Sequence, residues 1–214
     1  MFITFEGIEG SGKSTQIRLL KETLEAAGHQ VLLTREPGGC PVADRIRAVL
    51  LDAANREMSP MTELMLYAAA RAQHLTEVIK PALLAGKIVL CDRFSDATRA
   101  YQAFGRRLQR ETVELLNRLA CGDCAPDLTV LLDCDTKTGL GRARRRIEEN
   151  SSGPREERFE LEALPFHQRV RDGYLRLAAD EPERFVVVAA EGTPQEIAVK
   201  IHEQVIPRLE QLKP

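Results

Sequence analysis

One stretch near the beginning of the chain, Gly7-Ile8-Glu9-Gly10-Ser11-Gly12-Lys13-Ser14, matches the pattern G-x-x-x-x-G-K-[ST] without a mismatch. In loops of this pattern the backbone N–H groups surround phosphate oxygens. The lysine reaches the β- and γ-phosphates of a nucleotide, and the hydroxyl after it reaches Mg²⁺. The context also fits, because a strand-like run from Phe2 to Phe5 precedes the stretch and apolar residues at helical spacing follow it up to Gly28. The sequence therefore predicts a strand, a phosphate-binding loop and a helix in that order.

Short, largely apolar runs alternate with helical patterns along the whole chain. Five of these runs indicate strands, at 2–5, 31–33, 88–91, 128–132 and 185–188. Strands that are apolar throughout are typical of a parallel sheet with helices on both faces. We therefore predict an α/β fold of three layers with a five-stranded parallel sheet, formed as one domain by residues 1–214. Within the helical stretch 64–84, Pro81 is expected to cause a break or kink.

The composition argues against several classes of protein. Hydrophobic residues make up 43% of the chain, enough for a sizeable core, and a net charge of −2 gives no general attraction to nucleic acid. No apolar run approaches the roughly 18 residues that a membrane span needs. The chain enters a strand at once, without a signal-peptide pattern. We expect a cytoplasmic protein with no nucleic-acid or membrane partner.

The cysteines favour reduced thiols, because they number five and no export signal accompanies them. Cys121 and Cys124 have C-x-x-C spacing, which fits either a metal or redox pair or a loop after a helix. The sequence contains no second cysteine pair and no histidine pair at zinc spacing beside them. The loop is therefore the favoured interpretation.

Polar segments follow the ends of several predicted strands. In parallel sheets ligands bind beyond the carboxyl ends of the strands, which places 7–14, 35–39, 92–93 and the segment after Asp133 along one edge. At that edge Asp92 is suited to hold Mg²⁺ through water, and Arg93 is suited to bind a phosphate. Taken alone, this pair is equally compatible with an ion pair at the surface.

Two residues of a predicted helix, Tyr67 and Arg71, are four positions apart and share one face of that helix. A ring and a guanidinium on one face can stack on a nucleobase and hydrogen-bond its edge. The same spacing also fits a packed tyrosine beside a solvated arginine. These two residues alone leave both interpretations open.

Arginines gather in a helix and in the polar segment that follows it, at Arg142, Arg144, Arg145, Arg146, Arg155 and Arg158. Such a cluster is often a solvated helix face or a nucleic-acid patch. Beside a phosphate-binding loop it also fits a mobile lid, which closes over ATP and neutralises charge on the transferring phosphoryl group. We favour the lid and place it at about 142–158, with a mobile loop at 149–157 that contains Gly153 and Pro154.

From end to end the chain resembles the bacterial thymidylate kinase (dTMP kinase) family of P-loop nucleoside monophosphate kinases. The resemblance rests on four groups of residues in this order: Phe5-Glu6-Gly7-Ile8-Glu9-Gly10-Ser11-Gly12-Lys13-Ser14-Thr15, Thr34-Arg35-Glu36-Pro37-Gly38-Gly39, Arg71-Ala72-Gln73-His74, and Asp92-Arg93-Phe94 with Ala100-Tyr101-Gln102. The last group is the most specific, because it separates this family from other P-loop kinases. The resemblance implies a P-loop kinase fold, Mg²⁺ as cofactor, ATP as phosphoryl donor, dTMP as acceptor, and a homodimer.

The resemblance also implies roles for individual residues. ATP is expected to contact Gly7, Ile8, Glu9, Gly10, Ser11, Gly12, Lys13, Ser14, Thr15 and Arg142, and Mg²⁺ to contact Ser14 and Asp92. The residues expected around dTMP are Glu9 at the 3′-hydroxyl, Arg35, Arg93 and Arg47 at the phosphate, Tyr67 and Arg71 at thymine, and Thr98, Tyr101 and Gln102 at the nucleoside.

The resemblance assigns catalysis to Lys13, Asp92, Arg93 and one further arginine. Position 10 is an arginine in one branch of the family and is Gly10 here. Together with the arginines beyond residue 150, this glycine resembles the branch whose catalytic arginine comes from the lid. The candidates, in order, are Arg158, Arg155 and Arg146.

The chain departs from the family pattern where Tyr67 replaces a usual Phe, and at Ala70, Ala97, Cys40 and Thr136. None of these changes removes a phosphate ligand, so we expect them to affect affinity rather than the type of reaction. Two other functions remain as alternatives. One is a small P-loop kinase for a different nucleotide or nucleoside, and the other is a nucleotide-binding switch or assembly ATPase without a small acceptor.

Overall fold

The computed structural model describes residues 1–149 and 158–211, and its centre is a parallel sheet of five strands. The strand order is β2-β3-β1-β4-β5, so the first strand lies in the middle. The strands are β1 (Phe2–Glu6), β2 (Val31–Arg35), β3 (Ile88–Asp92), β4 (Leu128–Asp133) and β5 (Phe185–Ala189). The five predicted strands and their parallel arrangement are confirmed.

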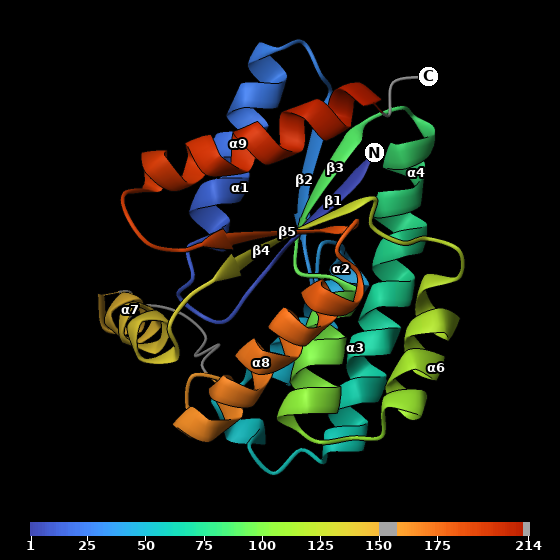
Figure 1. The fold of residues 1–214 in the computed structure, drawn as a ribbon. Helices are drawn as coiled ribbons and strands as arrows, with labels where there is room; N and C mark the ends of the chain where they lie inside the picture. The colour runs from blue at the N-terminus through green and yellow to red at the C-terminus, as the bar shows by residue number, and fades with distance from the viewer. Residues whose placement is uncertain (150–157, 212–214) are drawn as a thin grey trace.

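Helices cover both faces of the sheet and complete the three predicted layers. They are α1 (Lys13–Ala26), α2 (Pro41–Leu51), α3 (Pro60–His74), α4 (Lys80–Leu84), α5 (Ser95–Thr98), α6 (Arg110–Cys121), α7 (Thr136–Glu149), α8 (Leu164–Asp180) and α9 (Pro194–Gln211). Figure 1 shows α1 and α9 on one side of the sheet, with α3, α4, α6 and α8 on the other. In the same view α7 lies beyond the end of β4, and it contacts α8.

Two π-helical segments extend helices, Leu75–Ile79 between α3 and α4 and Arg99–Gly105 after α5. Pro81 lies in the first turn of α4, and the predicted interruption of the stretch 64–84 is the π-helical segment directly before that turn. A proline there lacks the N–H that a regular ladder needs. Arg99–Gly105 has no such signal in the sequence. Such segments are common at functional sites, and this one contains Tyr101 and Gln102.

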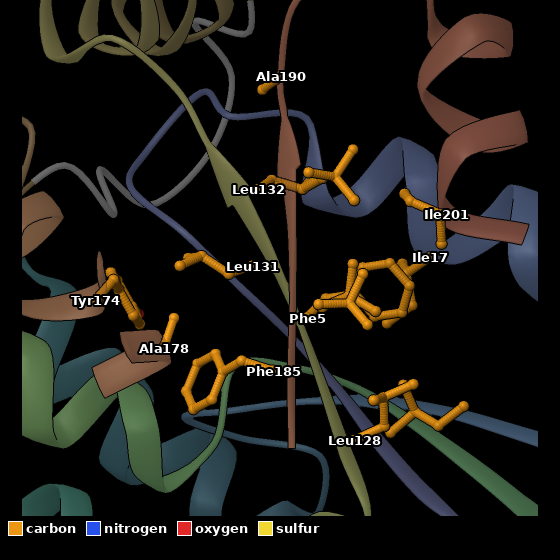
Figure 2. Packing of buried hydrophobic residues seen from close by; sticks show 14 of the residues in the cluster. Phe5, Ile17, Leu128, Leu131, Leu132, Tyr174, Ala178, Phe185, Ala190 and Ile201 are labelled. Atoms are coloured by element: carbon orange, nitrogen blue, oxygen red, sulfur yellow. The ribbon is translucent and has the colours of Figure 1, made fainter. Parts of the chain in front are cut away.

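The buried side chains fix the helices against the sheet. Figure 2 shows Ile17 of α1 and Ile201 of α9 beside Phe5 of β1, all members of one buried cluster. Tyr174 of α8 belongs to the same cluster and lies near Leu131 of β4, on the other side of the sheet in this view. Since α1 starts at the phosphate-binding loop, this packing also fixes the position of that loop.

The parallel strands bring distant segments to one edge of the sheet. Phe5 of β1 and Arg35 of β2 both pair with Asp92 of β3, so these three strands end at nearly the same level. The loop after β1, the segment after β2 and the pair Asp92-Arg93 therefore meet at the carboxyl edge, as the sequence predicts. The loop predicted at 149–157 lies outside the described residues except for Glu149, the last residue of α7.

Two findings bear on other predictions. Cys121 is the last residue of α6 and Cys124 lies in the loop after it, and all five thiols are free. Within residues 1–149 and 158–211, no helix is both long and apolar enough to cross a bilayer.

Candidate active site

A cavity of about 500 Å³ lies at the carboxyl edge of the sheet. Its walls come from the loop after β1 with the start of α1, the segment after β2, the end of β3, and parts of α2, α3, α5, the π-helical segment Arg99–Gly105 and α7. All nine residues that the resemblance assigns to dTMP line this cavity, together with Lys13, Ser14 and Asp92. The predicted site residues come from six separate segments of the chain, and the fold brings their side chains together around this cavity.

The loop after β1 depends on glycine for its shape. Gly7, Gly10 and Gly12 have φ angles of +137°, +69° and +95°, which L side chains rarely adopt. A Cβ at Gly10 would also lie only 2.0 Å from the backbone oxygen of Gly139 in α7. Helix α7 thus packs directly on the loop, and this arrangement has no room for the arginine that the other branch of the family has at position 10.

The Lys13 ammonium is buried inside the loop. It donates to the backbone oxygens of Gly7 and Ile8, at 2.9 and 2.8 Å. Burial lowers the pKa of Lys13 to about 8, and the positive charge of Arg93 acts in the same direction. A polyphosphate in the loop would supply the negative charge that this ammonium lacks, so the loop is electrostatically prepared for one.

Two predicted metal ligands face each other beside Lys13. The Ser14 hydroxyl donates to Asp92 Oδ2 at 3.1 Å. Hydroxyl and carboxylate oxygens are ligands that Mg²⁺ accepts in proteins while it keeps several of its waters. The residues at this point therefore fit a hydrated Mg²⁺.

Arg93 occupies a conformation that is unusual for an arginine, with φ of +69°. The Phe94 N–H after it donates to Glu6 Oε1 at 2.7 Å, which holds the turn in place. The guanidinium donates to Gly7 O at 2.9 Å and to Glu9 Oε1 at 3.2 Å. Its carboxylate partner is thus Glu9 rather than the adjacent Asp92, and its position in the cavity wall fits a phosphate ligand.

Glu9 is the acidic residue of the phosphate-binding loop. Its Oε1 accepts hydrogen bonds from the Tyr101 hydroxyl and from Arg93, and its Oε2 accepts one from His167. Burial by itself would raise the pKa of Glu9. The hydrogen bond from His167 and the charge of Arg93 outweigh burial and lower that pKa to about 2. Glu9 is therefore an ionised acceptor in the cavity wall at neutral pH.

Arg71 is only 1% exposed, so it is not the solvated arginine that the spacing also allowed. Its guanidinium donates to Glu36 Oε2, Asn117 Oδ1, Phe94 O and Thr98 Oγ1 at 2.8 to 3.0 Å. These contacts use four of its five N–H groups. Arg71 lines the cavity together with Tyr67, so a rigid guanidinium edge stands beside an aromatic ring.

The support of Arg71 includes residues for which sequence reasoning found no role. Glu36 binds Arg71 with one carboxylate oxygen, and its other oxygen lies 3.0 Å from Nδ1 of His74. Nε2 of His74 lies 2.7 Å from the Thr34 hydroxyl. Glu36 and His74 are part of the family strings quoted above. Both side chains are buried in the structure, which their spacing in the sequence does not predict.

The arginines of the predicted lid occupy different environments. Arg146 of α7 lines the cavity, whereas Arg142 lines a second groove on α7 of about 340 Å³. Arg158 is buried and donates to Leu50 O and, at 2.7 Å, to Glu63 Oε2. Arg155 lies outside the described residues. In this conformation Arg146, the third candidate, is therefore nearer to the cavity than Arg158, the first.

Glu63 is a second buried acid that the sequence analysis missed. It accepts hydrogen bonds from Gln102 and Arg106, in and directly after the π-helical segment Arg99–Gly105, and from Arg158 beyond α7. It thereby connects the helix that carries Tyr67 and Arg71 with the π-helical segment and with the end of the lid. No pattern in the sequence marks it, because its partners lie 39 to 95 residues away.

A parallel sheet with a G-x-x-x-x-G-K-S loop at its carboxyl edge, facing a cavity lined with arginines and a tyrosine, defines a P-loop nucleotide kinase. The model of the family "Thymidylate kinase" matches residues 5–201. The chain therefore belongs to the thymidylate kinase family.

Individual relatives agree with the family assignment. The chain is 69% identical to the thymidylate kinase of Trichlorobacter lovleyi over 98% of both chains. It is 65% identical to the thymidylate kinase of Pelobacter propionicus, over 96% of this chain and 93% of that one. Among solved structures, the thymidylate kinase of Ehrlichia chaffeensis has a TM-score of 0.77 at 33% identity and covers 96% of this chain and 98% of its own.

Proposed function

We propose that this protein transfers the γ-phosphoryl group of ATP to dTMP and forms ADP and dTDP. The observation that carries the proposal is that the cavity has two different sides. One side is the phosphate-binding loop with Lys13, Ser14 and Asp92, and the other contains the aromatic ring of Tyr67 beside the fixed guanidinium of Arg71. Such a cavity suits a donor polyphosphate facing an acceptor with a planar base.

The acceptor group needs no general base. A phosphate monoester has a second pKa of about 6, so it is mostly a dianion at neutral pH. The main obstacle is repulsion, since two unit charges about 4 Å apart repel by roughly 4 kcal/mol at an effective dielectric of 20. Lys13 and Arg93 supply positive charge at the cavity wall and offset this repulsion, and Arg35 and Arg47 line the same cavity.

The remaining roles follow from the same geometry. Ser14 and Asp92 would hold Mg²⁺, which neutralises charge on the β- and γ-phosphates when bound. Glu9 would accept a hydrogen bond from the 3′-hydroxyl of dTMP, and the ring of Tyr101 would lie against the deoxyribose. Gln102 and Thr98 support this wall through Glu63 and Arg71. Residues 142–158 would act as the lid of a single catalytic domain, with Arg142 near the adenine and a lid arginine at the transferred group.

Assays of ADP formation with dTMP, dUMP, dCMP and free thymidine as acceptors test the proposal. We expect dTMP to give the highest kcat/KM, and turnover to require Mg²⁺. Turnover of thymidine alone would identify a nucleoside kinase. ATP binding without turnover of any acceptor would identify a nucleotide-binding switch.

The lowered pKa of Lys13 predicts a pH dependence of ATP binding. Below about pH 8 the ammonium carries its proton and affinity is at its plateau. Above that pH the free protein loses the proton, and ATP binding must restore it. We expect the Kd for MgATP to rise by up to about tenfold per pH unit and binding to take up a proton. Calorimetry at pH 7 and pH 9 in two buffers measures both effects. A Kd for MgATP that does not change with pH and equals the Kd of the Lys13→Met variant would contradict the prediction.

We also propose that the protein works as a homodimer in the cytoplasm. Met65 of α3 and Leu119 of α6 are 55% and 73% exposed, and Leu115, one helical turn before Leu119 on α6, is exposed as well. Figure 1 shows α3 and α6 next to each other on the outside of the molecule. An apolar surface of this kind suits burial against a second copy. Sedimentation velocity of the intact protein measures the association, and a monomer at micromolar concentration would contradict it.

A further inference from the structure

The imidazole of His167 has no role in the reaction as described so far. It lies in the first turn of α8 and is fully buried, with Nδ1 at 3.1 Å from Oε2 of Glu9. Its second nitrogen, Nε2, is buried without a hydrogen-bond partner in the described part of the chain. An unpaired buried nitrogen costs free energy, which a phenylalanine of similar size would avoid. The contact with Glu9 is therefore the reason to have a histidine here.

The direction of this hydrogen bond follows from the charge of Glu9. The guanidinium of Arg93 and the hydroxyl of Tyr101, both bonded to Oε1, favour the ionised form of the Glu9 carboxylate, in which it accepts hydrogen bonds only. Nδ1 of His167 must then carry the proton and donate it to Oε2. In the neutral imidazole that has its proton on Nδ1, the buried Nε2 carries a lone pair and no N–H. The atom without a partner is then an acceptor and not a donor.

The hydrogen bonds of Glu9 also determine which acceptor position remains. A carboxylate has about four such positions, two on each oxygen. Tyr101 and Arg93 both bind Oε1, and His167 binds Oε2. Among the described residues these three donors leave one position, on Oε2. Because Glu9 lines the cavity, a ligand hydroxyl is the natural donor for that position.

We propose that His167 is a positioning residue, which fixes the rotation of the Glu9 carboxylate so that Oε2 accepts the 3′-hydroxyl of the acceptor nucleotide. The inference rests on the proposed function, since it concerns the acceptor side of the same cavity. His167 does not touch the substrate in this scheme. It acts on selectivity for the sugar through Glu9.

A second contact of α8 agrees with this role. Tyr174 lies seven residues after His167, two turns along the same face of the helix. Its hydroxyl donates to Glu6 at 2.6 Å and accepts from Arg93 at 3.2 Å. One face of α8 thus supports both Glu9 and Arg93, which are assigned to the 3′-hydroxyl and to the phosphate of dTMP.

The test compares dTMP with 3′-deoxythymidine 5′-monophosphate, which lacks the hydroxyl in question. We expect the wild-type protein to prefer dTMP in kcat/KM by about tenfold or more. His167→Phe is expected to lower kcat/KM for dTMP about tenfold and to change that for the 3′-deoxy nucleotide less than about twofold. The KM for ATP should stay the same. A purely structural defect would lower both acceptors equally, and that result would overturn the proposal.

Two conservative variants keep the test valid if His167→Phe does not fold. The amide nitrogen of asparagine can take the place of Nδ1, whereas that of glutamine reaches farther, toward the place of Nε2. We expect His167→Asn to retain most of the preference for dTMP and His167→Gln to lose it, with equal preference in the two contradicting the proposal. Arg176→Ala is the control on the same helix, because Arg176 is exposed and pairs with Asp180 at 3.1 Å.

The wild-type result separates this inference from the proposed function. A protein that does not phosphorylate dTMP would contradict the proposed function itself. A protein that phosphorylates dTMP and its 3′-deoxy analogue equally well would leave the function in place and overturn the inference about His167.

Discussion

Replacement of Lys13 by alanine is expected to lower kcat by about 10³-fold or more while the fold persists. The ammonium is the positive charge that the loop places nearest to the donor phosphates, and removing it leaves the repulsion between donor and acceptor less compensated. Burial already opposes this charge in the free protein, since it lowers the pKa of Lys13 to about 8. Loss of the ammonium therefore removes a cost of folding as well as three hydrogen bonds, two to backbone oxygens and one to the Ser11 hydroxyl.

Steady-state kinetics and thermal unfolding together check this prediction. Lys13→Met fills more of the space of the side chain and should be as inactive as Lys13→Ala. Lys21→Ala is the matched control, because Lys21 lies on the same helix α1 and forms an i,i+4 pair with Glu25 at 3.0 Å on the surface. We expect the Lys13 variants to bind dTMP within about threefold of wild type. Activity within about tenfold of wild type in both variants would contradict the proposed role of the loop.

The parts of the site that could be predicted from sequence depend on local patterns. The glycines of the loop determine where Lys13 and Ser14 lie, because the positive φ angles of these glycines fix the course of the backbone. Tyr67 and Arg71 reach one cavity because four residues make about one helical turn. The position of the residues after the strands could be predicted as well, because all carboxyl ends of the strands in a parallel sheet lie at one edge.

The partners that hold these residues could not be predicted in the same way. Glu36 and Asn117 bind Arg71 from 35 and 46 residues away, and His167 binds Glu9 from 158 residues away. Each contact depends on how helices pack on the sheet, and no short pattern encodes that packing. The burial of Arg158 has the same cause, because its partner Glu63 lies on α3.

Arg158→Ala is expected to lower kcat by about 10³-fold or more and to change the KM for dTMP by less than about threefold. An arginine that meets the phosphoryl group only during transfer contributes about 10³–10⁵ to the rate elsewhere. In the described conformation Arg158 donates to Glu63 and lies over the ring of Phe159, 4.6 Å from its centre. To reach the cavity it must leave Glu63, which keeps hydrogen bonds from Arg106 and Gln102. The variant therefore leaves no unpaired buried acid and should fold.

Comparison with Arg146→Ala decides between the two arginines. Arg146 already lines the cavity, so it can bind ATP in the ground state, and its loss should raise the KM for ATP more than it lowers kcat. Arg144→Ala serves as the control, because Arg144 is exposed on the same helix α7 and lines neither the cavity nor the groove of Arg142. An unchanged kcat in Arg158→Ala would move the catalytic role to Arg155 or Arg146, with a drop of about 10³-fold in Arg146→Ala identifying the latter. A large fall in kcat at Arg158 alone would mean that release from Glu63 precedes phosphoryl transfer in every turnover.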